Sequence, residues 1–337
     1  MNSDKKILTR FAPSPSGDLH LGNARSAILN WIYAKKNNGN LILRIDDTDS
    51  ERSKEIYIDS IKDDLEWLNL DWSLTFKQSE RLKNYSAKIL ELKNSGRLYA
   101  CFETTEELSL KKKSLLSSGK PPIYDRSSLK LTEKQKNDFI ANGKKPHWRF
   151  LIKNQNIHWN DLIRGEVSFE SKNLSDPILI REDGSLLYHL PSVIDDISEN
   201  ITHIIRGEDH ISNTAFHIQI FEALESPIPK FGHHPFLVDE QGKNFGKRLG
   251  SYSIKKLKDE GFENITLMNY LLSIGTNKNF FKEKKIKNLI KNFDIKNLTS
   301  SPPKFSHDSL VLLNREILQT YNFSEILDKL KNYNIEN

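Results

Sequence analysis

Hydrophobic positions in the N-terminal part of the chain follow two different periods. The segment "KKILTRFAP" contains a short apolar run that stops at Pro13, as expected of a buried strand. In "ARSAILNWIYAKKNNGN" the apolar residues follow helical spacing, and Gly39 marks the end of the helix. "LILRIDD" then predicts a second strand. Strand, helix and strand with short connections predict a parallel βαβ unit, whose ligands bind at the carboxyl ends of the strands.

The same patterns divide the rest of the chain. Two more helices are predicted at residues 53–68 and 79–95, and the periodicity is then poor from residue 97 to residue 180. We interpret that stretch as an inserted α+β domain, because "PILIREDGSLLYHLPSVIDDI" and "ITHIIRGEDHISNTAFHIQIFEAL" restore apolar strands and helices. Short amphipathic helices with lysine-rich polar faces follow. The predicted fold class is α/β, with an interrupted parallel-sheet domain and a helical C-terminal region.

Composition adds little to this picture. Of the 337 residues, 37% are hydrophobic and 28% are charged, as in ordinary globular proteins. The net charge of +5 is compatible with a polyanionic partner. It is weak evidence for one, because an AT-rich genome enriches Lys, Asn and Ile and produces the same excess.

Cysteine content and hydropathy exclude several classes of protein. The single cysteine, Cys101, excludes an internal disulfide and a cysteine-rich zinc site, and we expect a buried, inert thiol. No segment reaches the roughly 18 consecutive apolar residues of a membrane span, and "MNSDKKILTRF" lacks the apolar core of a signal peptide. We therefore expect a cytoplasmic protein that does not bind membranes.

The stretch "FAPSPSGDLHLGN" is the first candidate for chemistry. Pro13 and Pro15 stiffen an extended turn, and Gly17 and Gly22 allow close approach of the backbone to a ligand. A helix that begins near residue 21 presents unpaired N–H groups and a positive dipole end, which favours bound anions. His20 can donate a hydrogen bond to a phosphate there. The alternative is a plain connection between strand and helix.

Three further motifs carry charged residues at predicted strand ends or in a loop. "RIDDTD" at residues 44–49 has carboxylates suited to a cation or an ammonium group, or it is a solvated turn. "IIRGEDH" at residues 204–210 places both charge signs at the mouth of the sheet, which suits a zwitterionic or phosphorylated ligand. "GKNFGKRLGS" at residues 242–251 predicts a loop that closes on phosphates, or a surface charge run.

In their order and spacing these motifs resemble those of class I aminoacyl-tRNA synthetases, and most closely those of the glutamyl-tRNA synthetase subfamily. "HLGN" at residues 20–23 is similar to the HIGH motif, and "NFGKR" at residues 244–248 is similar to the KMSKS loop. The resemblance runs from about residue 6 to residue 320. It is also carried by the stretches "RFAPSPSG", "RIDDTD", "QSER", "PPIYDR", "WRF", "DLIRG", "YHLPSVIDD" and "HIIRGEDH".

The resemblance implies a reaction and its partners. L-glutamate and ATP, with Mg²⁺ accompanying the ATP, form glutamyl-adenylate and pyrophosphate. The glutamyl group then moves to the 3′-terminal adenosine of tRNA(Glu), with tRNA(Gln) as a second candidate acceptor. In such enzymes the protein forms no covalent bond to substrate, so positioning and charge stabilisation carry the catalysis. We expect a monomer without structural zinc.

The resemblance also assigns roles to residues by position. The implied catalytic residues are His20, Asn23, Lys247 and Arg248. The implied ATP-binding residues are His20, Gly22, Asn23, Glu208 and Lys247. The implied glutamate pocket comprises Arg10, Ala12, Ser14, Asp46, Tyr188 and Arg206. Physical chemistry supports two of these roles, since a guanidinium suits the side-chain carboxylate and Asp46 suits the α-ammonium group. No protein ligand to a metal is implied.

The family pattern also implies domain boundaries. Residues 1–96 and 187–240 form the two halves of a Rossmann-like catalytic domain. Residues 97–186 form the inserted acceptor-stem domain, and residues 241–337 carry the KMSKS-like loop and a helical stem-contact domain. The basic face of the insert is expected to contact tRNA phosphates.

Three departures from the family pattern bear on function. Asp46 stands where many relatives carry Glu, which is conservative. Asn244, Phe245 and Gly246 replace the Lys, Leu and Ser of the loop pattern KLSKR, and the lost hydroxyl and added flexibility lead us to expect slower adenylate formation. The chain reaches its last residue about where a helical anticodon-binding domain is expected, as in a fragment or a natural short form.

Two alternatives stay open at this stage. A glutamyl-queuosine tRNA(Asp) synthetase also lacks the anticodon-binding domain, although "RIDDTD" and "PPIYDR" favour the full synthetase. A catalytically weak, tRNA-binding paralogue is suggested by the altered loop. Glutaminyl-tRNA synthetase has a similar fold, but Arg206 favours an anionic substrate side chain.

Overall fold

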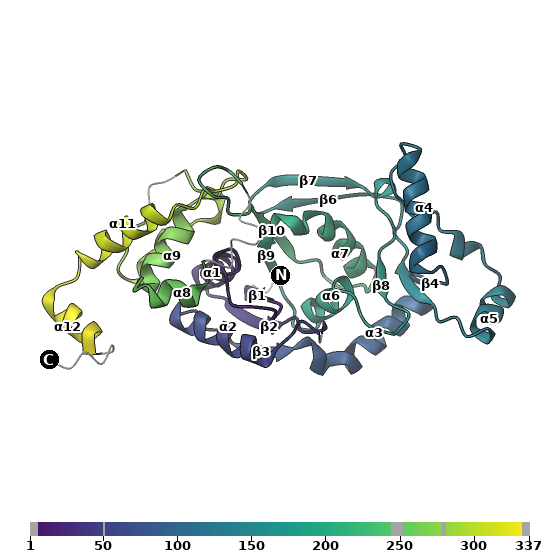
Figure 1. Cartoon of the computed structure of the whole chain (residues 1–337), viewed down its shortest axis with the longest axis horizontal. Helices are drawn as coiled ribbons and strands as arrows, with labels where there is room; N and C mark the ends of the chain where they lie inside the picture. The colour runs from purple at the N-terminus through teal and green to yellow at the C-terminus, as the bar shows by residue number, and fades with distance from the viewer. Residues whose placement is uncertain (1–5, 50, 244–251, 278–280, 332–337) are drawn as a thin grey trace, which may run out of the picture.

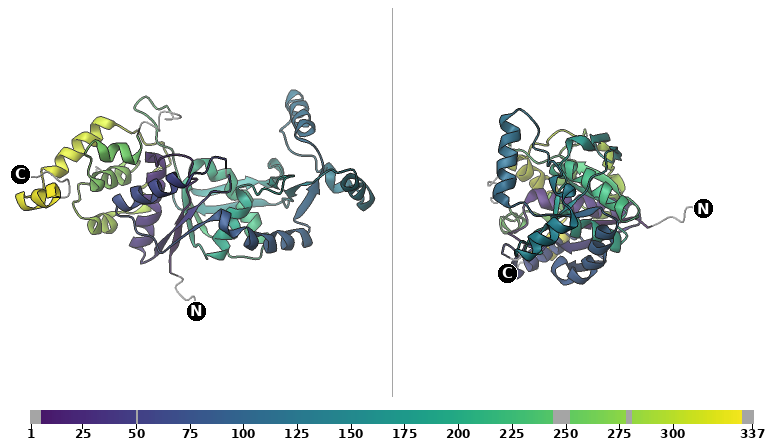
Figure 2. Two further views of the ribbon diagram at one scale, coloured as in Figure 1. Left: turned by 60° about the horizontal axis from the view of Figure 1, so that its bottom comes forward. Right: turned by 90° about the vertical axis from the view of Figure 1, so that its right-hand side faces the viewer.

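The computed structural model describes residues 6–49, 51–243, 252–277 and 281–331, with side chains up to residue 327. The molecule is elongated, with a parallel sheet near its middle, helices α4 (Thr105–Ser117) and α5 (Glu133–Ala141) at one end, and helices α11 (His307–Leu318) and α12 (Phe323–Lys331) at the other (Figure 1). Figure 2 shows the same arrangement from a second direction. No helix among these described residues is long and apolar enough to cross a membrane.

The central sheet is built from two sets of parallel strands. β1 (Leu8–Phe11), β2 (Asn40–Ile45) and β3 (Leu74–Lys77) pair in that order. β9 (His203–Gly207) pairs with β10 (Lys230–His234). β9 is joined to β1 where Thr202 N donates to Leu8 O at 2.9 Å and Leu8 N donates to Thr202 Oγ1 at 2.8 Å. The strand order therefore reverses between β1 and β9, and such a reversal opens a ligand crevice at the carboxyl ends of the strands.

Helices connect the strands as the sequence predicts. α1 (Leu21–Lys36) and α2 (Glu55–Trp67) follow β1 and β2, and α7 (Ile211–Ala223) follows β9. α6 (His189–Ser198) leads into β9, and η4 (Glu208–His210) separates β9 from α7. The helix predicted at residues 79–95 is α3 (Leu82–Asn94), preceded by the 3₁₀ turn η1 (Gln78–Arg81). The α/β class with a parallel sheet is thus confirmed.

The chain leaves the parallel sheet after α3 and returns to it at α6. In between, β4 (Leu98–Cys101), β5 (His147–Phe150) and β8 (Ile178–Ile180) form an antiparallel sheet in that order. β6 (Asn156–Asp161) and β7 (Gly165–Glu170) form a hairpin. Short 3₁₀ turns lie at η2 (Ser127–Lys130) and η3 (Ser171–Asn173). Cys101 is fully buried beside Tyr99 and Tyr124, as expected of an inert thiol.

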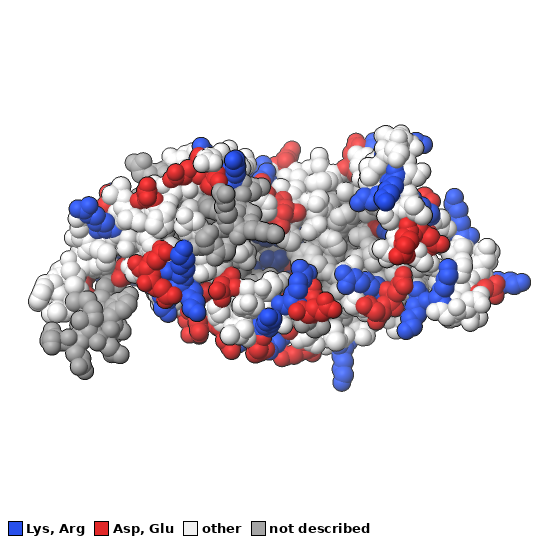
Figure 3. All heavy atoms as spheres, in the orientation of Figure 1, with Lys and Arg blue, Asp and Glu red and all other residues white. Residues whose placement is uncertain are grey.

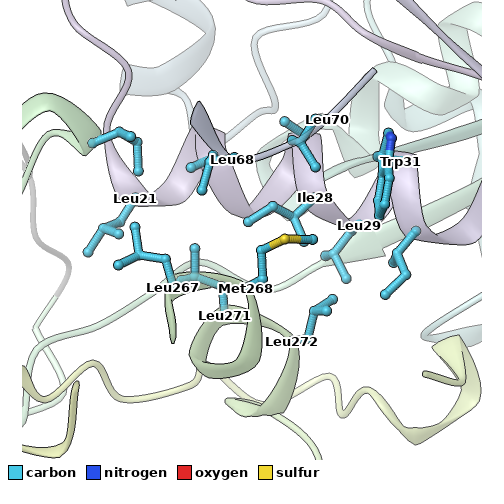
Figure 4. Close-up of a cluster of buried hydrophobic side chains, with 14 of the residues drawn as sticks. Leu21, Ile28, Leu29, Trp31, Leu68, Leu70, Leu267, Met268, Leu271 and Leu272 are labelled. Atoms are coloured by element: carbon cyan, nitrogen blue, oxygen red, sulfur yellow. The ribbon is translucent and has the colours of Figure 1, made fainter. Parts of the chain in front are cut away.

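The C-terminal region is helical in its described parts. It contains α8 (Ile254–Asp259), α9 (Asn264–Ser273), α10 (Ile286–Asn292) and the 3₁₀ turn η6 (Ile295–Asn297) ahead of α11 and α12. Figure 4 shows Leu267, Met268, Leu271 and Leu272 of α9 packed against α1 side chains such as Ile28. A single hydrophobic core therefore joins α1 to the C-terminal helices, and burial of this apolar surface holds α1 in place.

Candidate active site

A cleft of about 560 Å³ opens at the carboxyl ends of β1 and β9, where the strand order reverses. Its walls come from the β1–α1 connection, the end of β2, the start of α6, and the ends of β9 and β10. The structure brings nine of the predicted site residues together in the lining: Arg10, Ala12, Ser14, His20, Gly22, Asn23, Asp46, Tyr188 and Arg206.

The first turn of α1 forms one end of this cleft. His20 is the N-cap, and its Nδ1 accepts a hydrogen bond from Asn23 N at 3.4 Å. A Cβ on residue 22 would lie 3.3 Å from the His20 ring, so glycine there lets the ring fold against the helix. Burial lowers the pKa of His20, which leaves the imidazole neutral with its proton on Nε2. The helix start and this N–H are therefore donors for an anion.

Four charged side chains form a balanced network under the opposite end of the cleft. Arg44 donates from Nε and Nη2 to the two oxygens of Asp46 at 2.6 and 3.1 Å. Arg44 Nη1 also donates to Asp196 Oδ1 at 3.0 Å, and Arg10 Nε donates to the same atom at 3.2 Å. Burial raises the pKa of Asp46, and the Arg44 guanidinium opposes that rise. Two arginines thus face two aspartates, and each carboxylate is oriented before any ligand binds.

Arg206 lies in the same region without an ion-paired carboxylate among the described residues, although Asp196 is near enough to act on its charge. Its side chain is buried, and its hydrogen bonds go to Tyr188 Oη (3.1 Å), Thr214 Oγ1 (2.7 Å), His210 O (3.4 Å) and His233 Nε2 (3.4 Å). Within the described part of the chain, no carboxylate forms an ion pair with it. Burial lowers the pKa of Arg206 without discharging it. A buried cation with neutral partners is a site for an anionic group of a ligand.

One described residue of the predicted site, Glu208, stands apart from the cleft lining. Glu208 follows Gly207 at the rim, where its carboxylate accepts hydrogen bonds from the Arg164 guanidinium and from Phe236 N at 3.0 Å. Those contacts direct it toward the β6–β7 hairpin. Lys247 and Arg248 lie outside the described residues, as do residues 244–246 of the altered loop.

Several residues that the sequence did not single out also shape the site. Arg25 of α1 is buried, donates to Pro235 O at 3.0 Å and to Ile274 O at 3.1 Å, and has its pKa lowered by burial to about 10. It ties α1 to β10 and α9. The available signal was an arginine among the apolar positions of a helix. Arg44 gives the same kind of signal, because it is an arginine among the apolar positions of β2.

Among the residues with described placement, no cluster of three or more His, Cys, Asp or Glu side chains is arranged to hold a metal ion.

A buried anion site at one end of the crevice, an N-terminal helix turn at the other and an interrupted parallel sheet define a nucleotide-using α/β enzyme. The family profile described as "tRNA synthetases class I (E and Q), catalytic domain" matches residues 6–312. The chain belongs to this family.

Individual relatives agree with that assignment. The chain is 49% identical over 332 residues to glutamate–tRNA ligase 1 of Rickettsia bellii, covering 98% of this chain and 74% of the relative. It is 49% identical to the enzyme of the same name in Rickettsia prowazekii, with 97% and 73% covered. A crystal structure of a glutamate tRNA ligase from Elizabethkingia meningosepticum in complex with its amino acid superposes with a TM-score of 0.88 at 28% identity, covering 99% of this chain and 74% of that one.

Proposed function

We propose that this chain is a glutamate–tRNA ligase that activates L-glutamate with ATP and transfers it to tRNA(Glu). The observation that carries the proposal is Arg206, a buried guanidinium without a carboxylate partner among the described residues. It faces a cleft whose other end is the start of α1. An amino acid with an anionic side chain and a triphosphate together match these two ends.

The amino-acid end explains the choice of substrate. The glutamate side-chain carboxylate binds Arg206, and the α-ammonium binds the lone pairs of Asp46 that Arg44 leaves unused. Ser14 lines the same end, and the Tyr188 hydroxyl accepts from Arg206, so its own proton is available to the substrate. Ala12 contributes its small methyl side chain to the cleft lining. The balanced network of Arg10, Arg44, Asp46 and Asp196 leaves the charge of Arg206 for the substrate alone.

The nucleotide end supplies positioning and charge. The α-carboxylate oxygen of glutamate attacks the α-phosphorus of ATP, the bond to the bridging oxygen breaks, and pyrophosphate leaves with the electron pair. His20 donates through Nε2, and the N–H groups near Gly22 and Asn23 stabilise negative charge on the phosphates. Lys247 and Arg248, assigned from the sequence, add positive charge from the loop. Glu208, which the sequence assigns to ATP binding, acts in this proposal through Phe236 of the cleft wall, whose backbone N–H donates to its carboxylate.

Mg²⁺ fits this site as a companion of ATP. It supplies neutralisation of phosphate charge when bound, and we expect phosphate oxygens and water to hold it, because the described residues offer no cluster of ligands. This chain's own contribution is then the orientation of both substrates.

The tRNA is proposed to contact both ends of the molecule. Residues 97–186 are proposed to bind the acceptor stem, and the helices after residue 250 to contact the stem further along. Figure 3 shows basic side chains over α4 and α5, interspersed with acidic ones. Such a mixed surface suits contacts to phosphates at selected positions. We further propose a monomeric, cytoplasmic enzyme, with tRNA(Gln) as a second acceptor to be tested.

ATP–pyrophosphate exchange tests the amino-acid part of the proposal. Purified protein is assayed with L-glutamate, L-glutamine and L-aspartate, each with and without tRNA(Glu). We expect exchange with glutamate and at least about 100-fold less with glutamine, because a buried cation left unpaired costs about 3 kcal/mol or more. Comparable exchange with glutamine, or none with glutamate when tRNA(Glu) is present, would overturn the assignment. Gel filtration tests the monomer.

A further inference from the structure

The amino-acid end of the cleft is connected to the β6–β7 hairpin by two side chains that the proposed function does not use. Asp161 is the last residue of β6, and His233 belongs to β10. Both side chains have 0% solvent accessibility. His233 Nδ1 lies 2.5 Å from Asp161 Oδ2, while His233 Nε2 lies 3.4 Å from Arg206 Nε and 2.9 Å from Thr214 Oγ1. A continuous chain of contacts thus leads from the hairpin to Arg206.

The Asp161 carboxylate is fixed as an acceptor. Its Oδ1 accepts the backbone N–H groups of Ile163 and Arg164 at 3.1 Å each and of His233 at 3.0 Å. Burial alone would raise the pKa of Asp161, but the hydrogen bonds from His233 and from the backbone keep it below its ordinary value. An ionised carboxylate has no proton to give, so the proton between Asp161 and His233 resides on His233 Nδ1.

The state of His233 follows from that partner. Burial lowers its pKa, the Asp161 carboxylate opposes that shift, and the nearby Arg206 charge adds to it; the net direction is below the ordinary value, so the ring is neutral. With the proton on Nδ1, Nε2 carries a lone pair that accepts the N–H of Arg206. The Thr214 hydroxyl lies 2.9 Å from Nε2 and 3.1 Å from His210 O, and its one proton is shared between these two acceptors. The opposite tautomer, with the proton on Nε2, would point that N–H at the Nε–H of Arg206. Asp161 therefore selects the one form of His233 that can hold Arg206.

We propose that Asp161 and His233 are positioning residues that set the plane of the Arg206 guanidinium and thereby the affinity of the pocket for a substrate carboxylate. The proposal rests on the role of Arg206 under the proposed function. It assigns to the hairpin of the inserted segment a part in amino-acid binding, although Asp161 does not itself line the cleft.

The substitution D161N tests this pair at constant shape. The amide oxygen can keep the three backbone N–H bonds of Oδ1, which places the NH₂ group at the position of Oδ2. That group donates to Nδ1 and forces the proton of His233 onto Nε2, where it opposes Arg206. The matched control is D59N, which removes one negative charge by the same Asp→Asn change from an exposed position of α2.

Exchange kinetics give the first readout. In D161N we expect the KM for glutamate to rise about tenfold or more, with the KM for ATP within about twofold of wild type, and D59N to match wild type. A second pair, H233Q and H233L, separates hydrogen bonding from packing. The glutamine oxygen can replace Nε2 as an acceptor, so H233Q should retain more glutamate affinity than H233L. In the double variant D161N/H233Q, the loss of glutamate affinity should be smaller than the sum of the losses in the two single variants.

Nitrogen NMR of ¹⁵N-histidine-labelled protein gives a readout that does not depend on activity. The signal absent from H233Q identifies His233, and we expect the Nδ1–H form in wild type and the Nε2–H form in D161N. A wild-type Nε2–H form, an unchanged glutamate KM in D161N, or equal rises in both KM values would overturn the positioning role. If wild type fails to activate glutamate, the proposed function is wrong, and the tautomers still decide whether this pair exists.

Discussion

The substitution Arg206→Gln separates the charge of the amino-acid pocket from its polarity. A guanidinium has five N–H donors, and four hydrogen bonds of Arg206 are made within the protein, which leaves one donor on Nη1 for a ligand. Glutamine removes the charge and retains a polar group of intermediate length. The variant therefore tests whether the charge of Arg206 selects the substrate.

The expected loss can be worked from this geometry. One charge-assisted hydrogen bond contributes about 1.5–3 kcal/mol. Leaving the substrate carboxylate buried without a counter-charge raises the total to about 3–5 kcal/mol, because the other two arginines near it are already paired with Asp46 and Asp196. This corresponds to about 10²–10⁴-fold in kcat/KM for glutamate. Glutamine, which carries no charge, should lose about tenfold or less.

The assay is ATP–pyrophosphate exchange at saturating ATP with tRNA(Glu) present, over a range of glutamate and glutamine concentrations. Lys83→Gln, at an exposed position of α3, is the matched control for the loss of one positive charge and should behave as wild type. Thermal unfolding of Arg206→Gln checks that the fold is kept. Glutamate activation within tenfold of wild type, or an equal loss for both amino acids, would refute the reasoning.

Two further predictions concern stability and reactivity. Burial lowers the pKa of His147 and His203 to about 4 and that of His234 to about 3, so the unfolded chain binds protons that the folded one does not as pH falls below 6.5. Between pH 8 and pH 5.5 each of these histidines lowers the free energy of unfolding by about 1.4 kcal/mol. Asp64, whose pKa is raised by burial to about 7, raises the free energy of unfolding by about 2 kcal/mol over the same range. Urea titrations should show a net loss of at least about 2 kcal/mol, and stability that is flat or rising toward pH 5.5 would contradict this account. The Cys101 thiol, whose pKa burial raises to about 11, should react with a thiol reagent only in denaturant, and rapid labelling of the native protein would show that the site opens.

Local sequence signals predicted the elements around the cleft well. Apolar spacing and Gly39 predict a helix that the structure gives as α1 (Leu21–Lys36), and the predicted start near residue 21 agrees with His20 as its N-cap, while the anion site there stays a prediction. These features depend on neighbours a few residues apart, which a sequence displays directly. The helix predicted from residue 79 begins later, at Leu82, because the chain first makes a 3₁₀ turn.

Long-range charge arrangements were not predictable in this way. The partners of Arg10 and Arg44 include Asp196, more than 150 residues further along the chain, so no local pattern pairs them. Asp161 lies 72 residues before His233 and reaches it only because the hairpin folds back on β10. The sequence predicts that the Arg206 guanidinium suits a substrate carboxylate, but it does not show that most of its N–H donors are already used within the protein. Tertiary contacts, invisible to periodicity, decide the electrostatics of the pocket.

The measurement that tests the central claim most directly is aminoacylation of three separate tRNA transcripts. Purified protein, ATP and radiolabelled L-glutamate are incubated with tRNA(Glu), tRNA(Gln) or tRNA(Asp), and acid-precipitable label is followed with time. We predict charging of tRNA(Glu), with tRNA(Gln) as the only other acceptor. Charging of tRNA(Asp) alone, or tRNA binding without charging of any of the three, would contradict the assignment of this chain as a glutamate–tRNA ligase.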